Sequence, residues 1–216
     1  PEDVRLVGIS STLATNSIAE AKAKDVGLIL VGYDPDLLSS YDLEDRFAAR
    51  EFVYFRGGHD SQGEEREPLD LAGIREWVED NKQEFDAFAV SSYFSPLNAD
   101  HEEKVAEAIY EISSRPVVMG HQLSTQLDSV KRATTAALNA ALVSVMQEFI
   151  EAVRRALAEK GIKAPLMVVR GDGSLMPYDE AVRKPVETIV SGPAATAIGG
   201  YFLCDATSGL LMDVGG

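Results

Sequence analysis

Short apolar runs rich in β-branched residues alternate along the chain with longer stretches in which apolar positions recur every three or four residues. The first pattern predicts buried strands and the second predicts amphipathic helices. We expect strands at residues 4–10, 26–31, 51–55, 87–92, 116–119, 166–170 and 210–214. We expect helices at residues 17–23, 69–84, 98–113, 130–159 and 194–203. Strands separated by helices are joined by crossovers, so the pattern predicts an α/β fold with a mixed, mostly parallel sheet.

The stretch from 130 to 159 is the longest predicted helix, and an apolar stripe follows most of its length. The stripe consists of Leu138, Leu142, Val145, Phe149, Val153 and Leu157. Gly161 comes just after the stripe, and glycine at this place ends many helices. A polar segment separates this helix from the alternating units before it, so we expect two domains, at residues 1–122 and 123–216. Residues 57–68 carry glycines and a run of charges, which predicts an exposed loop or hairpin.

The net charge and the number of cysteines indicate which binding partners and which cellular location to expect for this protein. The 216 residues include 35 acidic and 20 basic side chains, and the net charge is −15. Nucleic acids and anionic membranes select basic surfaces, so neither is an expected partner. The single cysteine, Cys204, excludes an internal disulfide and follows small helical residues, which predicts a buried structural thiol. No apolar run approaches the length of a membrane span and no signal peptide precedes the first strand, so the expected location is the cytoplasm.

The last predicted strand ends in Asp213-Val214-Gly215-Gly216. A carboxylate at the carboxyl end of a strand can hold a hydrated Mg²⁺ ion, and the glycines let the following turn bring backbone N–H groups close to a phosphate. The chain stops inside this turn and starts at Pro1 rather than at a methionine. We therefore expect it to be a piece of a longer protein.

Two other glycine-containing segments come before this turn. Ser191-Gly192-Pro193-Ala194-Ala195 opens the last predicted helix, where free N–H groups and the helix dipole favour an anion. Taken alone, a serine cap followed by tight packing explains it better, and the later Asp-x-Gly-Gly segment shifts the balance to phosphate. Gly171-Asp172-Gly173 follows the strand at 166–170 and can bring a carboxylate to a metal ion or a ribose hydroxyl. Asp-Gly is also a plain turn signal, and the turn is favoured when this segment is taken alone.

A turn rich in hydroxyl groups follows the first predicted strand and contains Thr12, Thr15 and Asn16. Ligands of open α/β sheets bind beyond the carboxyl ends of the strands, so these side chains can contact a substrate or a phosphate. Helix capping is the alternative, and it would use only one or two of them.

The three histidines have no regular spacing and do not indicate a transition-metal site. His59 and His121 are candidate pocket residues, whereas His101 is expected in the first turn of a helix. The chain lacks the Gly-x-Ser-x-Gly and P-loop signatures, which argues against a serine hydrolase and a P-loop NTPase.

Seven short groups of residues follow one another along nearly the whole chain, and their order matters as much as their composition. They are Ser11-Thr12-Leu13-Ala14-Thr15-Asn16; Gly58-His59-Asp60 with Pro68-Leu69-Asp70; Ser95-Pro96-Leu97-Asn98 with His101-Glu102; Lys131-Arg132-Ala133-Thr134-Thr135 with Asn139-Ala140; Gly171-Asp172-Gly173; Ser191-Gly192-Pro193-Ala194-Ala195; and Asp213-Val214-Gly215-Gly216. This ordered series resembles the hydantoinase A/5-oxoprolinase family, which includes N-methylhydantoinase A and the nucleotide-binding subunit of acetone carboxylase.

The resemblance implies a ribonuclease-H-like, actin-like ATPase architecture, and an enzyme that uses ATP and Mg²⁺ to activate the carbonyl of a cyclic amide. Residues 1–122 then belong to the family's N-terminal domain, and residues 123–216 begin its hydantoinase A domain. The implied roles fall into three groups. The catalytic carboxylates are Asp213, which also holds the metal, and Asp172. The phosphate-binding residues are Gly171, Gly173, Ser191, Gly192, Ala194, Gly215 and Gly216. The substrate-binding residues are Thr12, Thr15, Asn16 and His59.

Three departures from the family pattern qualify this resemblance. The family's first Asp-x-Gly-Gly-Thr phosphate loop is absent, and the second is cut before its threonine. The usual Gly-Thr-Thr is Ser10-Ser11-Thr12 here. We therefore expect the chain to be inactive alone, as a fragment incomplete at both ends. A cyclic amide substrate and a hydantoinase B-type partner subunit are the expected partners of the whole protein. A small-molecule kinase of the same superfamily and a non-enzymatic ATP-binding domain are the alternatives.

Overall fold

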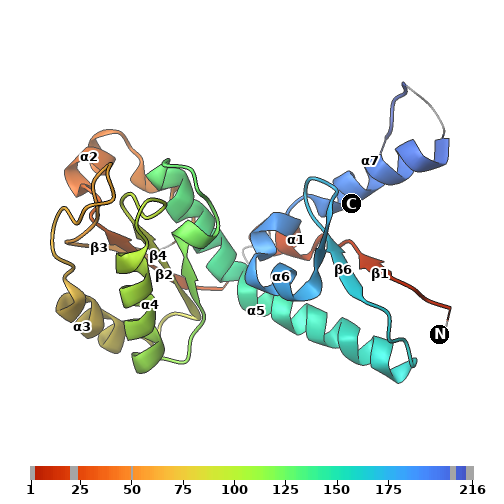
Figure 1. Ribbon diagram of the computed structural model, residues 1–216, viewed down its shortest axis with the longest axis horizontal. Helices are drawn as coiled ribbons and strands as arrows, with labels where there is room; N and C mark the ends of the chain where they lie inside the picture. Colours follow the sequence, from red (N-terminus) through yellow and green to blue (C-terminus); the bar gives the residue numbers. More distant parts are fainter. Residues whose placement is uncertain (1–2, 20–23, 50, 205–207, 213–216) are drawn as a thin grey trace. The chain divides into compact units, whose positions relative to one another are not determined.

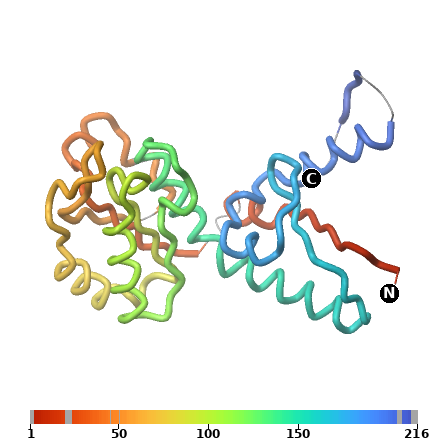
Figure 2. The backbone as a smooth tube through the Cα atoms, viewed as in Figure 1, coloured from red at the N-terminus to blue at the C-terminus, as the bar shows by residue number. Residues whose placement is uncertain are grey.

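The computed structural model describes residues 3–19, 24–49, 51–204 and 208–212. The chain divides into two compact units, one made of residues 1–23 and 142–216 and the other of residues 24–141 (Figures 1 and 2). The long helix α5, Ser129–Glu159, contributes residues to both. These units follow spatial contacts, and the division expected at residue 122 stays a prediction about the domains of the whole protein.

The unit of residues 24–141 is built on a four-stranded sheet in the order β3-β2-β4-β5. The strands are β2 (Val26–Val31), β3 (Glu51–Phe55), β4 (Ala87–Ser92) and β5 (Val117–Met119), and all neighbours are parallel. Every residue of β2 and β4 is buried, as expected for central strands covered on both faces.

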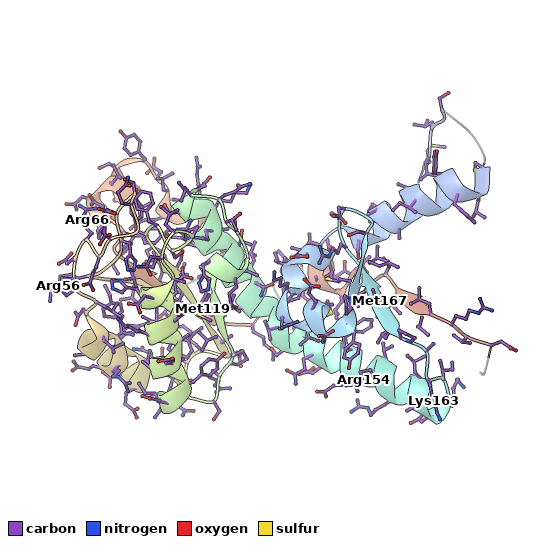
Figure 3. The ribbon with its side chains drawn as sticks, viewed as in Figure 1. Arg56, Arg66, Met119, Arg154, Lys163 and Met167 are labelled. Atoms are coloured by element: carbon purple, nitrogen blue, oxygen red, sulfur yellow. The ribbon has the colours of Figure 1, made fainter. Side chains whose placement is uncertain are left out.

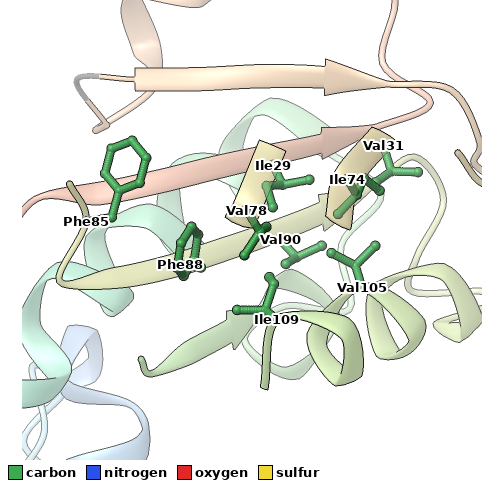
Figure 4. Close-up of a cluster of buried hydrophobic side chains, with 9 residues drawn as sticks. All are labelled: Ile29, Val31, Ile74, Val78, Phe85, Phe88, Val90, Val105 and Ile109. Carbon is green, nitrogen blue, oxygen red and sulfur yellow. The ribbon is translucent and has the colours of Figure 1, made fainter. Parts of the chain in front are cut away.

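Helices cover both faces of this sheet. Helices α3 (Leu71–Asn81) and α4 (Asp100–Ile112) lie on one face, where their apolar side chains meet those of β2 and β4 in one core (Figure 4). On the other face the first part of α5 runs along β2. The Lys24 N–H donates to the carbonyl oxygen of Ala141 at 3.2 Å, and the Tyr33 hydroxyl donates to the carbonyl oxygen of Ser129 at 2.8 Å. Short elements complete the unit: α2 (Pro35–Ser40), η1 (Glu44–Arg46) and η2 (Gly120–Gln122).

The other unit has a three-stranded sheet in the order β1-β6-β7. Strand β1 (Val7–Ile9) is parallel to β6 (Leu166–Val169), whereas β7 (Leu175–Pro177) returns antiparallel to β6. Met146 and Ile150 of α5 pack with the buried residues of β6 and β7. Figure 3 labels Arg154 of α5, whose guanidinium lies 4.8 Å from the centre of the Tyr178 ring. The remaining helices are α1 (Leu13–Ala19), α6 (Tyr178–Arg183), η3 (Pro185–Thr188) and α7 (Ser191–Cys204).

The α/β prediction with mostly parallel strands is confirmed, and three predicted strands coincide with β2, β3 and β4. The prediction of a strand from residue 210 is wrong for its described part, residues 210–212. Leu210 is 89% exposed and Met212 is 78% exposed, and no neighbouring strand offers them backbone partners among the described residues.

Three further expectations need correction. Cys204 is exposed rather than buried, because the last turn of α7 is open to solvent: Phe202 is 84% exposed and Leu203 80%. The stretch at 57–68 is not exposed throughout, since Gly57, Gly58 and His59 are buried.

Helix α5 corrects the expectation that no apolar run approaches the length of a membrane span. It is long and apolar enough to cross a membrane by length and composition, with a mean hydropathy of 1.3 in one 18-residue window. Its apolar side chains are buried inside the protein: Ala133, Ala136, Ala140 and Leu142 are at most 1% exposed.

Candidate functional site

Segments distant in sequence meet at one edge of the β1-β6-β7 sheet. Strands β1 and β6 are parallel, so the turn after β1 and the turn after β6 leave the sheet on the same side. Ser191, the first residue of α7, joins the first of these turns. Its fully buried hydroxyl donates to the carbonyl oxygen of Ser11 at 3.1 Å, and Ser10 Oγ lies 3.4 Å away. The predicted hydroxyl turn and the predicted anion-binding helix start are therefore in direct contact.

The start of α7 can offer only some of its first amides to a ligand. Pro193 has no N–H group, and the N–H of Ala194 already donates to the carbonyl oxygen of Val190 at 3.3 Å. Among the described residues, the amides of Ser191 and Gly192 have no backbone partner, although Ser191 is fully buried and only Gly192 is open to solvent. A helix of 14 residues adds the positive end of its dipole at the same place.

Val190, just before α7, has an unusual backbone conformation with a φ of 57°. A β-branched residue is strained in this left-handed region, so neighbouring contacts must hold it there. Thr15 of α1 supplies one of them, because its hydroxyl oxygen accepts the N–H of Val190 at 3.2 Å. Nothing in the sequence marked Val190, since valine gives no signal for a positive φ.

Gly171 and Gly173 let the turn after β6 approach the segment that leads into α7. A Cβ atom on Gly171 would lie 2.3 Å from the carbonyl oxygen of Ile189, and Gly171 N–H donates to the carbonyl of Glu187 at 2.8 Å. A Cβ on Gly173 would lie 2.2 Å from Ile198 Cδ1, and its φ of 85° favours glycine. Glycine is thus required by close packing at position 171 and favoured by the positive φ at position 173, whatever ligand they meet.

Asp172 stands between these glycines with an exposed carboxylate. Its Oδ1 accepts the Ser174 N–H at 2.8 Å and the Ser174 hydroxyl at 2.7 Å, and these bonds lower the pKa of Asp172. The side chain is therefore an anion at neutral pH and its Oδ2 is left for a cation. Arg170, the last residue before the turn, is held by Glu180 at 3.1 Å and Glu187 at 3.2 Å.

His59 lies in the unit of residues 24–141, close to His101. Their ring centres are 4.3 Å apart, and His59, Asp100 and His101 each place a ligand-type atom within 4.8 Å of the others. His101 Nδ1 accepts the Gly58 N–H at 2.9 Å, so the neutral ring carries its proton on Nε2, which faces Glu65 Oε1 at 3.0 Å. A protonated nitrogen cannot bind a metal ion, so this cluster fits a hydrogen-bonded network and not a metal centre.

His59 itself is 2% exposed and its Nδ1 has no hydrogen-bond partner among the described residues. Burial, followed by the neighbouring His101, lowers the pKa of His59, so its ring is neutral at physiological pH.

The structure thus gathers most of the predicted site residues at one sheet edge. The gathered residues are Thr12, Thr15, Asn16, Gly171, Asp172, Gly173, Ser191, Gly192 and Ala194. His59 belongs to the other unit. Asp213, Gly215 and Gly216 lie outside the described residues, so their predicted roles stay predictions.

Comparison with known proteins covers nearly the whole chain. The hydantoinase/oxoprolinase N-terminal region matches residues 1–113, and the hydantoinase/oxoprolinase domain matches residues 132–216. The chain is 31% identical over 151 residues to the caprolactamase subunit alpha of Pseudomonas jessenii, which covers 68% of this chain and 21% of that protein. It is 29% identical over 126 residues to the acetophenone carboxylase gamma subunit of Aromatoleum aromaticum, which covers 55% of this chain and 17% of that protein.

A solved structure agrees with these sequence matches. The crystal structure of the ATP-dependent caprolactamase from Pseudomonas jessenii superimposes with a TM-score of 0.79 and 25% identity. The match covers 94% of this chain and 32% of that one. This chain therefore spans about a fifth of the length of the curated relatives and about a third of the solved chain. Because the family's N-terminal region alone matches 113 of the 216 residues, the chain belongs to the hydantoinase/oxoprolinase family.

Proposed function

We propose that this chain is part of an ATP-dependent amidohydrolase that opens a cyclic amide of the hydantoin, 5-oxoproline or lactam type. One observation carries the proposal. The relative that is 31% identical over 68% of this chain is a caprolactamase subunit, and the solved caprolactamase that shares the fold is ATP-dependent.

In this proposal the edge of the β1-β6-β7 sheet binds the phosphates of ATP. The amides of Ser191 and Gly192 donate to phosphate oxygens, and the closely packed turn at Gly171 and Gly173 lies beside them. Catalysis rests on positioning and on stabilising developing charge rather than on a covalent nucleophile.

Mg²⁺ is part of the proposal, with Asp213 as its principal ligand. Among the described residues, Asp172 fits a supporting role, because it is anionic and one of its carboxylate oxygens is unpaired. When bound, the ion would neutralise phosphate charge during transfer to the amide carbonyl.

The contacts of the hydroxyl turn support different proposed roles for its residues. Thr15 is engaged with Val190, whereas Thr12 and Asn16 are exposed and bonded mainly to each other, Asn16 Nδ2 donating to Thr12 Oγ1 at 3.3 Å. We therefore assign substrate contact in this unit first to Thr12 and Asn16, and the role proposed for His59 concerns the unit of residues 24–141 by itself.

A second subunit and a cytoplasmic location complete the proposal. The two curated relatives are named as subunits of larger enzymes, which supports a hydantoinase B-type partner for the whole protein. The net charge of −15 supports neither nucleic acid nor an anionic membrane as a partner.

The test is turnover by the full-length protein, alone and with its partner subunit. We expect ADP formation that depends on 5-oxoproline, a hydantoin or a lactam, with a ring-opened amino acid as the product. Acetophenone with bicarbonate belongs in the same panel, because one relative is a carboxylase subunit. A phosphorylated small molecule as the final product, or no substrate-dependent ADP formation, would overturn the proposal.

A further inference from the structure

A fully buried carboxylate lies beside the carboxyl ends of β4 and β5. It belongs to Glu102 of α4, and its Oε1 accepts the N–H of Ser92 at 2.8 Å. Its Oε2 accepts two bonds from His121, one from the backbone N–H at 2.9 Å and one from ring Nδ1 at 2.6 Å. Three donors therefore surround this buried carboxylate.

This arrangement fixes the tautomer of His121. The carboxylate can only accept, so Nδ1 carries a proton and the neutral ring has its lone pair on Nε2. No described residue pairs with Nε2, and the His121 side chain keeps 18% of its surface exposed. A carboxylate that holds Nδ1–H while Nε2 is free is the arrangement of a general base with its orienting group.

Other residues pack closely around this pair. Arg132 of α5 is 1% exposed and donates to the carbonyls of Ser92 and Gln126, each at 2.9 Å. A Cβ atom on Gly120 would lie 3.0 Å from Arg132 Cγ and 3.3 Å from Glu102 Oε1. Glycine at this position therefore lets the η2 turn carry His121 onto the carboxylate.

Unsatisfied polar atoms lie next to the pair. Ser92 Oγ, Ser95 Oγ and Arg132 Nε are buried and have no hydrogen-bond partner among the described residues. All three belong to residues arranged around one carbonyl, because Ser92 O accepts both the Ser95 N–H at 3.1 Å and Arg132. Buried donors of this kind need an acceptor, so they indicate a polar ligand or ordered water near the Ser92 carbonyl.

We propose that His121 is a proton-transfer residue acting on a water-attacked amide, and that Glu102 is its positioning residue. The chemical step rests on the proposed function. As the water oxygen bonds to the activated carbonyl carbon, Nε2 accepts one proton from that water. When the C–N bond breaks, its electron pair stays on nitrogen, the imidazolium returns the proton to that nitrogen, and the remaining hydroxyl proton passes to solvent. The acyl phosphate that is left is hydrolysed by a second water to a carboxylate and inorganic phosphate.

The charged groups around His121 set its pH dependence. Glu102, through its hydrogen bond, raises the pKa of His121, partial burial opposes this, Glu103 adds to the rise and Arg132 opposes it. Because the base form is the neutral ring, turnover should fall as pH decreases through this raised pKa.

The pairing can be tested without any substrate. Diethyl pyrocarbonate acylates neutral imidazole, so its rate on His121 against pH, followed by peptide mass spectrometry of the full-length protein, reports the pKa. We expect the midpoint to lie above that of an ordinary histidine and to fall in Glu102→Gln, while the exposed Glu107→Gln leaves it unchanged. A midpoint that Glu102→Gln does not move would overturn the positioning role.

Turnover then tests the chemical role. Gln in His121→Gln can still donate to Glu102 but cannot take up a proton, so we expect turnover to fall about 10²- to 10⁴-fold with a nearly unchanged melting temperature. Glu102→Gln should lower kcat and displace its pH profile, and Glu107→Gln should do neither. Near wild-type kcat in a folded His121→Gln enzyme would overturn the proposal. The absence of wild-type turnover on any cyclic amide would instead count against the proposed function. The pH dependence of His121 modification would still show whether Glu102 positions His121.

Discussion

Replacing Gly192 with alanine separates a phosphate-binding helix start from one that is merely capped. A Cβ atom at this position would meet only Thr12 Cγ2, at 3.6 Å, which is an ordinary contact. Alanine also favours a helix over glycine by up to about 1 kcal/mol. Gly192→Ala should therefore leave the fold intact, with a melting temperature equal to or above that of the wild type.

The expected effect on nucleotide is the opposite. An amide bound to a phosphate oxygen brings that oxygen to about 3 Å, and an added methyl group beside the amide obstructs this approach. A hydrogen bond to a charged group contributes about 1.5–3 kcal/mol. Since 1.4 kcal/mol is a factor of ten, Gly192→Ala should weaken ATP binding about 10- to 100-fold.

Gly199→Ala is the matched control, because it adds the same methyl group to the same helix where nothing lies within 4 Å. Both variants should be made in the full-length protein, with ATP affinity measured by calorimetry and stability by thermal unfolding. Equal ATP affinities in the two variants would refute phosphate binding at Ser191 and Gly192 and leave a capped helix start.

Three further predictions concern the proposed ATP site. Thr15→Val keeps the side-chain volume but removes the acceptor for the Val190 N–H, so stability should fall by about 1 kcal/mol and ATP affinity should fall with it. Weaker substrate binding at an unchanged melting temperature would instead indicate that Thr15 contacts the substrate. Asp213→Asn in the full-length protein should lower turnover at least about 100-fold while the melting temperature is little changed, and near wild-type ATPase activity would remove Asp213 from the metal site. The 216-residue chain alone should hydrolyse no ATP in a phosphate-release assay, and robust Mg²⁺-dependent turnover by it would contradict the need for two phosphate loops.

Periodicity predicted the parts of the fold whose burial is uniform. Strands β2 and β4 are apolar throughout and are covered on both faces, so local composition alone located them. Strand β7 has three residues with only Met176 buried, and helix α6 has six residues, so neither carries enough periodic positions to be recognised. The run at 210–212 is apolar but highly exposed, and apolar composition alone could not supply the neighbouring strand that it lacks among the described residues.

The sequence was sufficient to recognise the segments that form the site, but not the contacts between their residues. The glycines and hydroxyls at 10–16, 171–173 and 191–194 were recognisable by residue type, and the structure brings these segments together. The pairing of Glu102 with His121 was not recognisable, because the two residues are 19 positions apart, with strand β5 between them. His121 alone gave no sign of a partner, and Glu102 resembled any acidic residue in the first turn of a helix.

The bond between Thr15 and Val190 shows why residue types alone could not define this site. The two residues are 175 positions apart, and the bond holds a valine in a backbone conformation that its own side chain disfavours. That conformation directs the chain into α7, so the position of the Ser191 and Gly192 amides depends on a hydroxyl in α1. In the proposed function, the hydroxyl turn would therefore act on phosphate binding through the backbone, even if Thr12 and Asn16 contact the substrate. Substitutions at Thr15 and Gly192 should then be non-additive in ATP affinity, whereas Thr15 and Gly199 should combine additively.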